Sequence, residues 1–188
     1  MNIKTIVFSV FAFFGVMNNA LAGPLCALAP AGHNPRLDQP ASRFAADQMR
    51  LVSNFLCGRF RCPQFSFHQN PTIQNAMAWS DQTDSIIRYN AGFMNRTARS
   101  YGNFAAIGIF AHELGHIIDF SQNQGQIPQP QREATADRYA GCVFALAGHP
   151  ESDLLSLARS LHAMGASPGY PTPAERVQLV RIGYRQCR

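Results

Sequence analysis

Hydrophobic residues recur at helical spacing between residues 104 and 118, and this stretch is the strongest structural signal in the chain. Apolar side chains three or four residues apart line one face of a helix, so the pattern predicts a buried core helix. Ser100 or Asn103 could cap its start. Its polar interruptions fall almost entirely within residues 112–116, and polar groups in such a helix are costly unless they are paired or bind a metal. The apolar residues are Phe104, Ile107, Phe110, Ala111, Leu114, Ile117 and Ile118.

Helical periodicity also marks four other segments. Residues 42–56, 131–148 and 150–164 each place apolar side chains on one side of a predicted helix. A last helix is predicted after Thr172, which can cap it, with Glu175 placed to reach back in a capping box.

Alternation of apolar and polar residues predicts strands over residues 64–70, 76–80 and 85–89, the last two joined by a polar turn into a hairpin. The proline-rich residues 24–40 are expected to form an extended arm, and the polar residues 121–130 a loop between two helices. We therefore predict one α+β domain over residues 23–188. It should be mostly helical, with a small antiparallel sheet or hairpin beside the helix at 104–118.

The polar residues of that helix read His112-Glu113-Leu114-Gly115-His116. Histidines four residues apart project from one face of a helix, with Cβ atoms roughly 6 Å apart. This spacing suits one tetrahedral zinc ion, which each imidazole binds at about 2.0–2.1 Å. Glu113 leaves the same turn and can reach a metal-bound water, so it is the candidate general base. The alternative is a pair of hydrogen-bonded core histidines beside a surface carboxylate.

The next helix offers a third ligand, because Glu133 and Asp137 lie one turn apart on one face. Glu133 can complete the zinc site and leave the fourth position for water. Asp137 can accept the free N–H of a ligand histidine and fix its tautomer. The alternative is a solvated pair of carboxylates, which the small and apolar neighbours disfavour. A third histidine six residues after the second, the competing pattern, is absent because position 122 is glutamine.

This order of residues resembles the gluzincin metallopeptidases, especially small soluble relatives of the CaaX-prenyl-endopeptidase-like group. Ala-His-Glu-Leu-Gly-His is followed on the next helix by Glu-x-x-Ala-Asp-x-x-Ala-Gly. Ile-Ile-Arg-Tyr-Asn precedes the helix that contains the two histidines. The likeness runs from about residue 75 to residue 187. In that family a His-Pro sequence and a later arginine open the last helix. Here Tyr170 stands in place of the histidine, followed by Pro171 and Arg176.

The resemblance implies a zincin-like fold and zinc-dependent peptidase activity. It implies that Arg176, or the hydroxyl of Tyr170, stabilises the oxyanion that develops during attack. It also implies that an edge strand beside the metal pairs with the substrate backbone, either at residues 75–79 or at residues 86–89. The alternatives are a solvated helix arginine and a hairpin that only covers the core.

Residues 1–22 have the pattern of a secretory signal peptide. Lys4 precedes an apolar run at 6–16 that is too short to span a bilayer, and Ala20-Leu21-Ala22 suits a cleavage site. The mature chain is expected to begin at Gly23 and to be secreted or periplasmic. No later stretch is apolar enough to cross a membrane. The alternative is an uncleaved anchor.

Five cysteines in an oxidising compartment predict two disulfides and one free thiol. Cys57 and Cys62 flank a short turn and could pair locally, and Cys26 and Cys187 would then tie the termini. Cys142 lies among apolar residues of the Glu133 helix, so we expect it to be buried and free.

The charge distribution narrows the class of partner. Fifteen arginines accompany eleven acidic residues, and the only lysine is Lys4. The positive excess is scattered, which argues against a nucleic-acid-binding surface. We therefore predict a monomeric, secreted or periplasmic zinc endopeptidase that acts on peptides or proteins. The alternatives are a zinc amidohydrolase acting on cell-envelope substrates and an exported zinc-binding or chaperone-like protein without activity.

Overall fold

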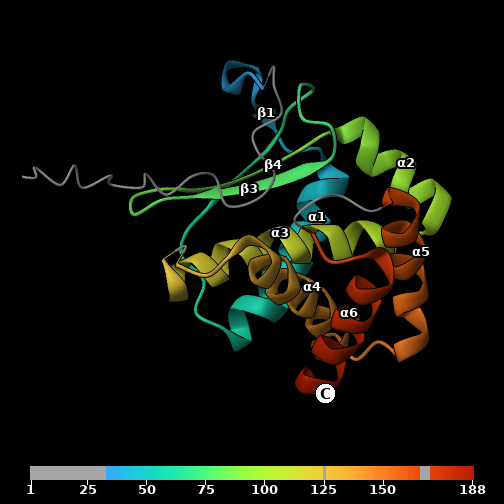
Figure 1. Ribbon diagram of the computed structural model, residues 1–188. Coiled ribbons are helices and arrows are strands. Elements are labelled where there is room, and N and C mark those ends of the chain that lie inside the picture. The colour runs from blue at the N-terminus through green and yellow to red at the C-terminus, as the bar shows by residue number, and fades with distance from the viewer. Residues whose placement is uncertain (1–32, 125, 166–169) are drawn as a thin grey trace, which may run out of the picture.

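The computed structural model describes residues 33–124, 126–165 and 170–188. Within these ranges the chain forms helices packed beside a small sheet, which confirms the predicted mostly helical α+β class (Figure 1). The elements in chain order are the 3₁₀ helix η1 (Pro35–Leu37), β1 (Gln39–Pro40), α1 (Arg43–Arg59), β2 (Ser66–Gln69), β3 (Ala76–Ser80), β4 (Ser85–Tyr89), α2 (Ala91–Tyr101), α3 (Asn103–Asn123), α4 (Gln129–Leu146), the 3₁₀ helix η2 (Glu151–Asp153), α5 (Leu154–Met164) and α6 (Pro173–Cys187).

The sheet has the strand order β1-β2-β4-β3. β3 and β4 form the predicted antiparallel hairpin, with Ala78 opposite Ile87 and Ser80 opposite Ser85. β2 lies parallel to β4 on its other side, and β1 pairs with β2 antiparallel. The prediction of an antiparallel sheet is wrong in one respect, because β2 is parallel to β4 and the sheet is mixed. The sheet is also wider than the hairpin, because β2 and β1 join it and part of the predicted extended arm supplies β1. Among the described strands, β3 is an edge that pairs only with β4.

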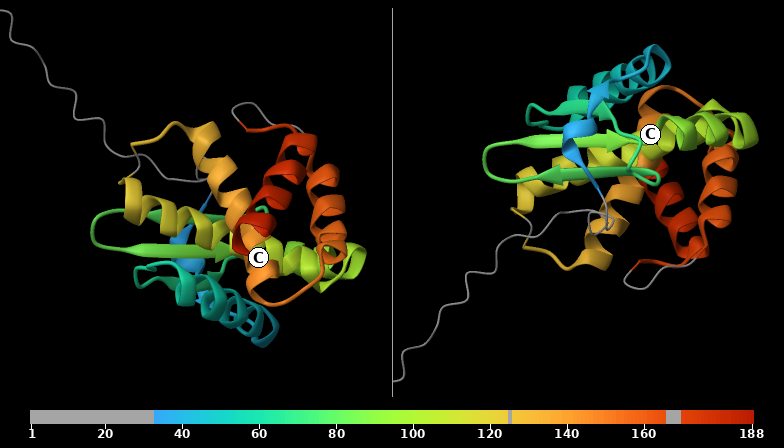
Figure 2. Two further views of the ribbon diagram at one scale, coloured as in Figure 1. Left: turned by 90° about the horizontal axis from the view of Figure 1, so that it is seen from below. Right: turned by 90° about the horizontal axis from the view of Figure 1, so that it is seen from above.

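Helix α3 lies at the centre of the fold. Its residues 105–120 are all buried. β3 contacts it from the sheet side and α4 from the opposite side, while α1, α2 and α5 also pack against it (Figure 2). A helix that is apolar nearly all round requires cover on every side, and these neighbours provide it.

Two glycines let α4 and α6 approach closely. Gly141 of α4 faces the α6 backbone at Val180, and Gly183 of α6 faces the α4 backbone at Arg138. A Cβ atom at either glycine would overlap the facing carbonyl group. The close contact is possible only without a side chain, so these residues set how α6 lies along α4.

The disulfides tie these helices further. Cys57 pairs with Cys62 as predicted. The expectation that Cys142 is free and that Cys187 pairs with Cys26 is wrong, because Cys142 is bonded to Cys187. The reason is the packing of α6 along α4, which brings the end of α6 beside the C-terminal half of α4. Cys26 lies outside the described residues.

Helix α2 was not predicted from periodicity. Asn90 caps its start by accepting a hydrogen bond from the Phe93 N–H. It ends at Tyr101 and is followed by Gly102, whose φ of 92° suits glycine, and α3 begins at the next residue. Gly102 is therefore the N-cap of α3. The prediction that Ser100 or Asn103 caps this helix is wrong.

The helices after α3 follow the predicted order. The loop between the two site helices is shorter than residues 121–130, since α3 ends at Asn123 and α4 begins at Gln129. α6 begins with the predicted capping box, in which Thr172 Oγ1 accepts from the Glu175 N–H and the Glu175 carboxylate accepts from the Thr172 N–H. Local signals were sufficient to locate this helix start.

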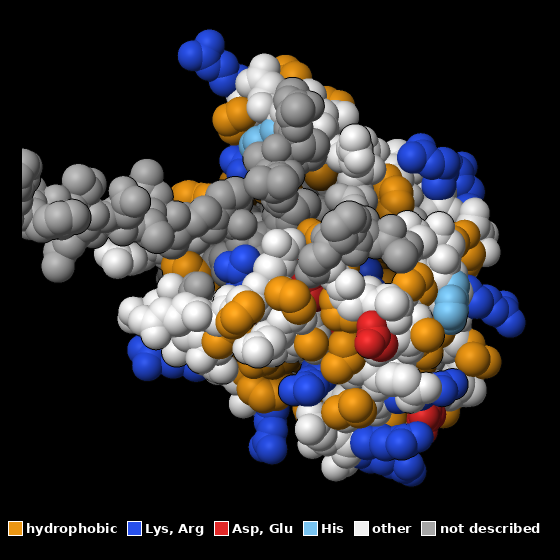
Figure 3. All heavy atoms as spheres, viewed as in Figure 1, with side chains coloured by type: hydrophobic (Ala, Val, Ile, Leu, Met, Phe, Trp, Pro, Cys, Tyr) orange, Lys and Arg blue, Asp and Glu red, His pale blue; other side chains and the backbone are white. Residues whose placement is uncertain are grey.

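Within the described ranges, no helix is both long enough and apolar enough to span a bilayer. The predicted signal peptide, residues 1–22, lies outside these ranges. On the face shown in Figure 3, basic side chains are spread around the edge, and hydrophobic and polar side chains are mixed between them.

Candidate metal centre

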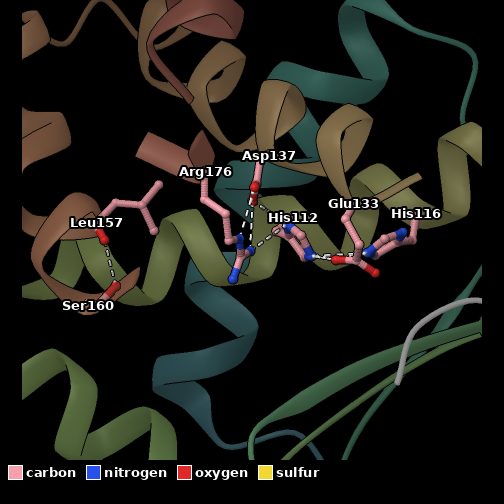
Figure 4. A network of polar contacts seen from close by, with 7 residues as sticks. All are labelled: His112, His116, Glu133, Asp137, Leu157, Ser160 and Arg176. Carbon is pink, nitrogen blue, oxygen red and sulfur yellow. Dashed lines mark hydrogen bonds and ion pairs between the residues drawn. The ribbon is translucent and has the colours of Figure 1, made fainter. Parts of the chain in front are cut away.

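His112 and His116 lie one turn apart on α3 and face Glu133 of α4 (Figure 4). The two Nε2 atoms are 3.0 Å apart. Glu133 Oε2 lies 3.3 Å from His112 Nε2 and 3.7 Å from His116 Nε2. All three side chains are buried. Two helices therefore bring two imidazole nitrogens and one carboxylate oxygen to a single point.

Gly115 accounts for the close approach of α4 at this point. A Cβ atom built on Gly115 would lie 2.9 Å from Tyr139 Cβ and 3.1 Å from Ala136 Cα, both on α4. These distances are too short for ordinary packing, so a larger residue would move α4 and Glu133 away from the histidines. The glycine between the two histidines thus has a packing role in the site.

The three separations fit one metal ion. Ligands bound tetrahedrally at about 2.0–2.1 Å lie roughly 3.3 Å from one another. The observed separations are 3.0, 3.3 and 3.7 Å. No pair of the ligand atoms is more than 4.8 Å apart. The buried group of His112, His116 and Glu133, predicted as the ligand set, could therefore hold a metal ion.

Asp137 contacts the other ring nitrogen of His112. Its Oδ1 lies 2.9 Å from His112 Nδ1. Because an ionised carboxylate can only accept, Nδ1 donates this hydrogen bond, and Nε2, which faces Glu133 and His116, is the ring nitrogen left to bind a metal. This contact is the one expected of a residue that orients a ligand histidine.

Arg176, at the start of α6, is paired with Asp137. Its Nε donates to Oδ2 at 2.9 Å and its Nη2 donates to Oδ1 at 2.7 Å. This two-point contact fixes the carboxylate in both position and rotation. The structure thus forms a chain from Arg176 through Asp137 to His112, whereas the sequence suggested a cation facing the oxyanion.

The charges of the centre are arranged as if around a cation. Burial alone would raise the pKa of Glu133, but hydrogen bonds from His112 and His116 hold that pKa well below its usual range. Burial would lower the pKa of His112, but its hydrogen bonds with Asp137 and Glu133 raise the pKa to about 10. Burial would also raise the pKa of Asp137, and its contacts with His112 and Arg176 lower it instead. Two ionised carboxylates therefore share a buried site that favours positive charge.

Glu113 has a different environment from the ligand carboxylate. It is buried and lines the same cavity as His112 and Glu133. Its Oε2 has no hydrogen-bond partner among the described residues. Burial raises the pKa of Glu113, and the charges of His112 and His116 oppose this rise. A carboxyl group with a raised pKa and an available oxygen beside the site suits proton transfer.

Tyr170 and Arg176 line the cavity that contains Glu113. Residues 166–169, which lead to Tyr170, are outside the described ranges. Both residues suggested for the oxyanion therefore come to the site, although Arg176 is engaged with Asp137.

The edge strand β3 begins at the same cavity, which Asn75 and Ala76 line. The Asn75 carbonyl accepts from the Asn90 N–H. With the antiparallel register of β3 and β4, this bond turns the backbone groups of Ala76, Ala78 and Ser80 away from β4. Of the two strands suggested as the edge, β3 is the edge and β4 lies inside the sheet.

Asp119 is a buried acidic residue to which sequence reasoning gave no role. It follows His116 by three residues on α3, and its Oδ1 accepts from Asn123. Its Oδ2 has no hydrogen-bond partner within the described part of the chain, and burial raises the pKa of this carboxyl. Its position three residues after His116, which places it near the same helix face, was the sequence signal that could have identified Asp119. The Asp137–Arg176 contact had no comparable signal, because the two residues come from different helices.

Comparisons with protein-family models, with curated proteins and with solved structures found no match, so any assignment of function rests on the geometry of this centre.

Proposed function

We propose that this protein is a zinc-dependent endopeptidase of the gluzincin type that hydrolyses peptide bonds. The supporting observation is the convergence of His112, His116 and Glu133 from two helices, with Glu113 on the same cavity. Two histidines and one glutamate are a ligand set of catalytic zinc sites, which keep one position open for water or substrate. Imidazole and carboxylate donors also suit zinc better than sulfur-seeking metals.

Zinc at this centre would supply a Lewis acid that polarises the substrate carbonyl and lowers the pKa of a water molecule towards about 7. Glu113 accepts a proton from the attacking water and gives it to the nitrogen of the leaving amine. The water oxygen forms a bond to the carbonyl carbon, the C–N bond breaks, and the proton ends on the amine. The raised pKa of Glu113 favours uptake of the proton from the attacking water.

Asp137 and Arg176 have positioning roles in this proposal. Asp137 holds the proton on His112 Nδ1 and so directs Nε2 towards the metal position. Arg176 fixes Asp137 through two hydrogen bonds. Because Arg176 is committed to this contact, the Tyr170 hydroxyl is our candidate for stabilising the oxyanion.

An extended peptide is the proposed substrate, bound by strand addition to β3. The outward backbone groups of Ala76, Ala78 and Ser80 provide the hydrogen-bonding edge for such a peptide. We also propose export to the periplasm or the medium, based on the signal-peptide pattern of residues 1–22. The two disulfides are compatible with an oxidising compartment.

The test compares zinc-loaded native protein with Glu113→Gln on a proteome-derived peptide library, with cleavage read by mass spectrometry. Native protein should cleave the library, and Glu113→Gln should bind equal zinc and cleave about 10²–10⁴-fold more slowly. Glu151→Gln, a change in a half-exposed glutamate of η2, is the matched control and should cleave like native protein. Equal cleavage by native protein and Glu113→Gln would refute the proposed role.

Digestion of purified cell wall with the same proteins separates the alternatives. Release of new amines from cell wall without cleavage of peptides would support an amidohydrolase. Bound zinc with no action on either substrate would support an exported zinc-binding protein.

A further inference from the structure

Part of the cavity of the metal centre is lined by hydrophobic residues of α2, α3 and α5. We call this part of the cavity the apolar pocket, and its residues are Phe93, Ile109, Leu157, Leu161 and Met164. Leu157 and Leu161 are buried, at 1% and 3% exposure, while Met164 is 39% exposed at the end of α5. Figure 4 shows the Leu157 side chain reaching towards α3 on the Arg176 side of His112.

The apolar pocket adjoins the groups that would meet a substrate. Asn75 and Ala76, where β3 begins, line the same cavity as His112 and Glu113. Side chains of an extended peptide alternate between its two faces. A peptide paired with β3, with a carbonyl near Glu113, therefore places one side chain next to the cleaved bond in reach of this pocket.

The size of the cavity limits that side chain. The whole cavity, with the part beside the metal centre included, has a volume of about 80 Å³, whereas an apolar cavity of about 150 Å³ holds one benzene molecule. An aromatic side chain would not fit without movement of the walls. A charged or amide side chain would lose its water and gain no partner from the five hydrophobic residues that form these walls.

Gly108 of α3 determines how the far wall is filled. A Cβ atom at this position would lie 2.5–2.9 Å from the side-chain carbons of Leu157. Leu157 therefore occupies space that a side chain at position 108 would otherwise take. A larger residue at position 108 would displace the end of the flexible Leu157 side chain.

We infer that the apolar pocket is a specificity pocket that selects a small aliphatic side chain, from alanine to valine in size, on a residue flanking the cleaved peptide bond. This inference rests on the proposed peptidase function and names its substrate class. A methylene group more or less in such a pocket changes selection by about 10–200-fold.

The first test maps cleavage of a proteome-derived peptide library by zinc-loaded native protein and by Leu161→Ala. Native protein should prefer alanine or valine over phenylalanine at one flanking position by about tenfold or more. Leu161→Ala enlarges the pocket and should shift the preference towards leucine and phenylalanine. Leu155→Ala, on the same helix but 50% exposed, is the matched control and should keep the native preference. Cleavage without any preference at the flanking positions would overturn the inference.

A second variant tests the opposite change. Gly108→Ala should move Leu157, narrow the pocket and reduce cleavage beside valine-sized residues more than cleavage beside glycine. Zinc content and the thermal unfolding midpoint show whether the variant remains folded and loaded. A folded, zinc-loaded Gly108→Ala with the native preference would contradict the assignment of the pocket.

Calorimetric binding of glycine, valine and phenylalanine hydroxamates to zinc-loaded protein provides a readout that needs no turnover. Valine hydroxamate should bind most tightly to native protein, and phenylalanine hydroxamate should gain affinity for Leu161→Ala. Equal binding of all three compounds would overturn the specificity pocket and leave the peptidase proposal standing. No binding of any hydroxamate would overturn both.

Discussion

Two buried glutamates on neighbouring helices have opposite environments. Glu133 on α4 lies within 3.7 Å of two imidazole nitrogens, which hold its pKa well below the usual range despite burial. Glu113 on α3 lines the same cavity, but burial dominates and raises its pKa. One carboxyl is thus fixed as a negative charge, and the other is able to take up a proton.

The difference shows that neighbours, and not residue type, assign the roles. Carboxyl groups whose surroundings move their pKa values in opposite directions are suited to different tasks at one site. Glu133 is the one suited to bind a metal, and Glu113 is the one suited to move a proton. Substitutions of the residues around these two glutamates test this difference, and the expected effects follow from the largest to the smallest.

Replacement of His116 by alanine should have the largest effect. It removes one proposed ligand and one of the two groups that keep Glu133 ionised. We expect purified His116→Ala to contain no stoichiometric zinc and to show no hydrolysis, as measured by inductively coupled plasma mass spectrometry and the library assay. His162→Ala, on exposed α5 surface, is the control and should keep both. Native zinc content in His116→Ala would contradict the ligand assignment.

Asp137→Asn should have an intermediate effect. The ionised carboxylate that accepts from His112 Nδ1 is replaced by an amide, so the orientation of the imidazole is less well fixed. Loss of such a contact weakens metal binding by about 10–100-fold. Competition with a chromogenic chelator measures the affinity, and Asp153→Asn, which alters the contact with His149 instead, is the control. An unchanged affinity would show that Asp137 does not orient the ligand.

Arg176→Lys should have the smallest effect of the three. Lysine keeps the positive charge beside Asp137 but cannot reproduce the two parallel hydrogen bonds of the guanidinium group. We expect zinc affinity to fall by about tenfold or less, which is a smaller loss than the one expected for Asp137→Asn. Arg181→Lys, 40% exposed on the same helix, should bind zinc like native protein. A loss as large as that in His116→Ala would mean that Arg176 does more than position Asp137.

Much of the architecture could be predicted because its signals are local. The strands at residues 76–80 and 85–89 have the predicted bounds, since alternation and a polar turn specify a hairpin. The capping box of Thr172 and Glu175 likewise marks a helix start within four residues. The two histidines and Glu133 converge because each pattern places its residues on one helix face, and the two faces meet.

The rest depends on contacts between distant segments. Cys142 looked like a buried free thiol because its sequence neighbours are apolar, and only the packing of α4 against α6 shows Cys187 beside it. The same packing brings Arg176 to Asp137. α2 was not predicted, although Met94, Ala98 and Tyr101 recur at helical spacing in its short sequence. These differences leave the predicted ligand set unchanged but alter how it is supported.

The central claim is that two imidazoles and the carboxylate of Glu133 bind one divalent ion. X-ray absorption spectroscopy of zinc-loaded native protein, with Glu133→Ala beside it, tests this claim most directly. We predict one zinc per native chain with two imidazole nitrogens and oxygen ligands at about 2.0–2.1 Å, and loss of stoichiometric zinc from Glu133→Ala. Native protein that binds no zinc, or a Glu133→Ala spectrum identical to the native one, would contradict the account.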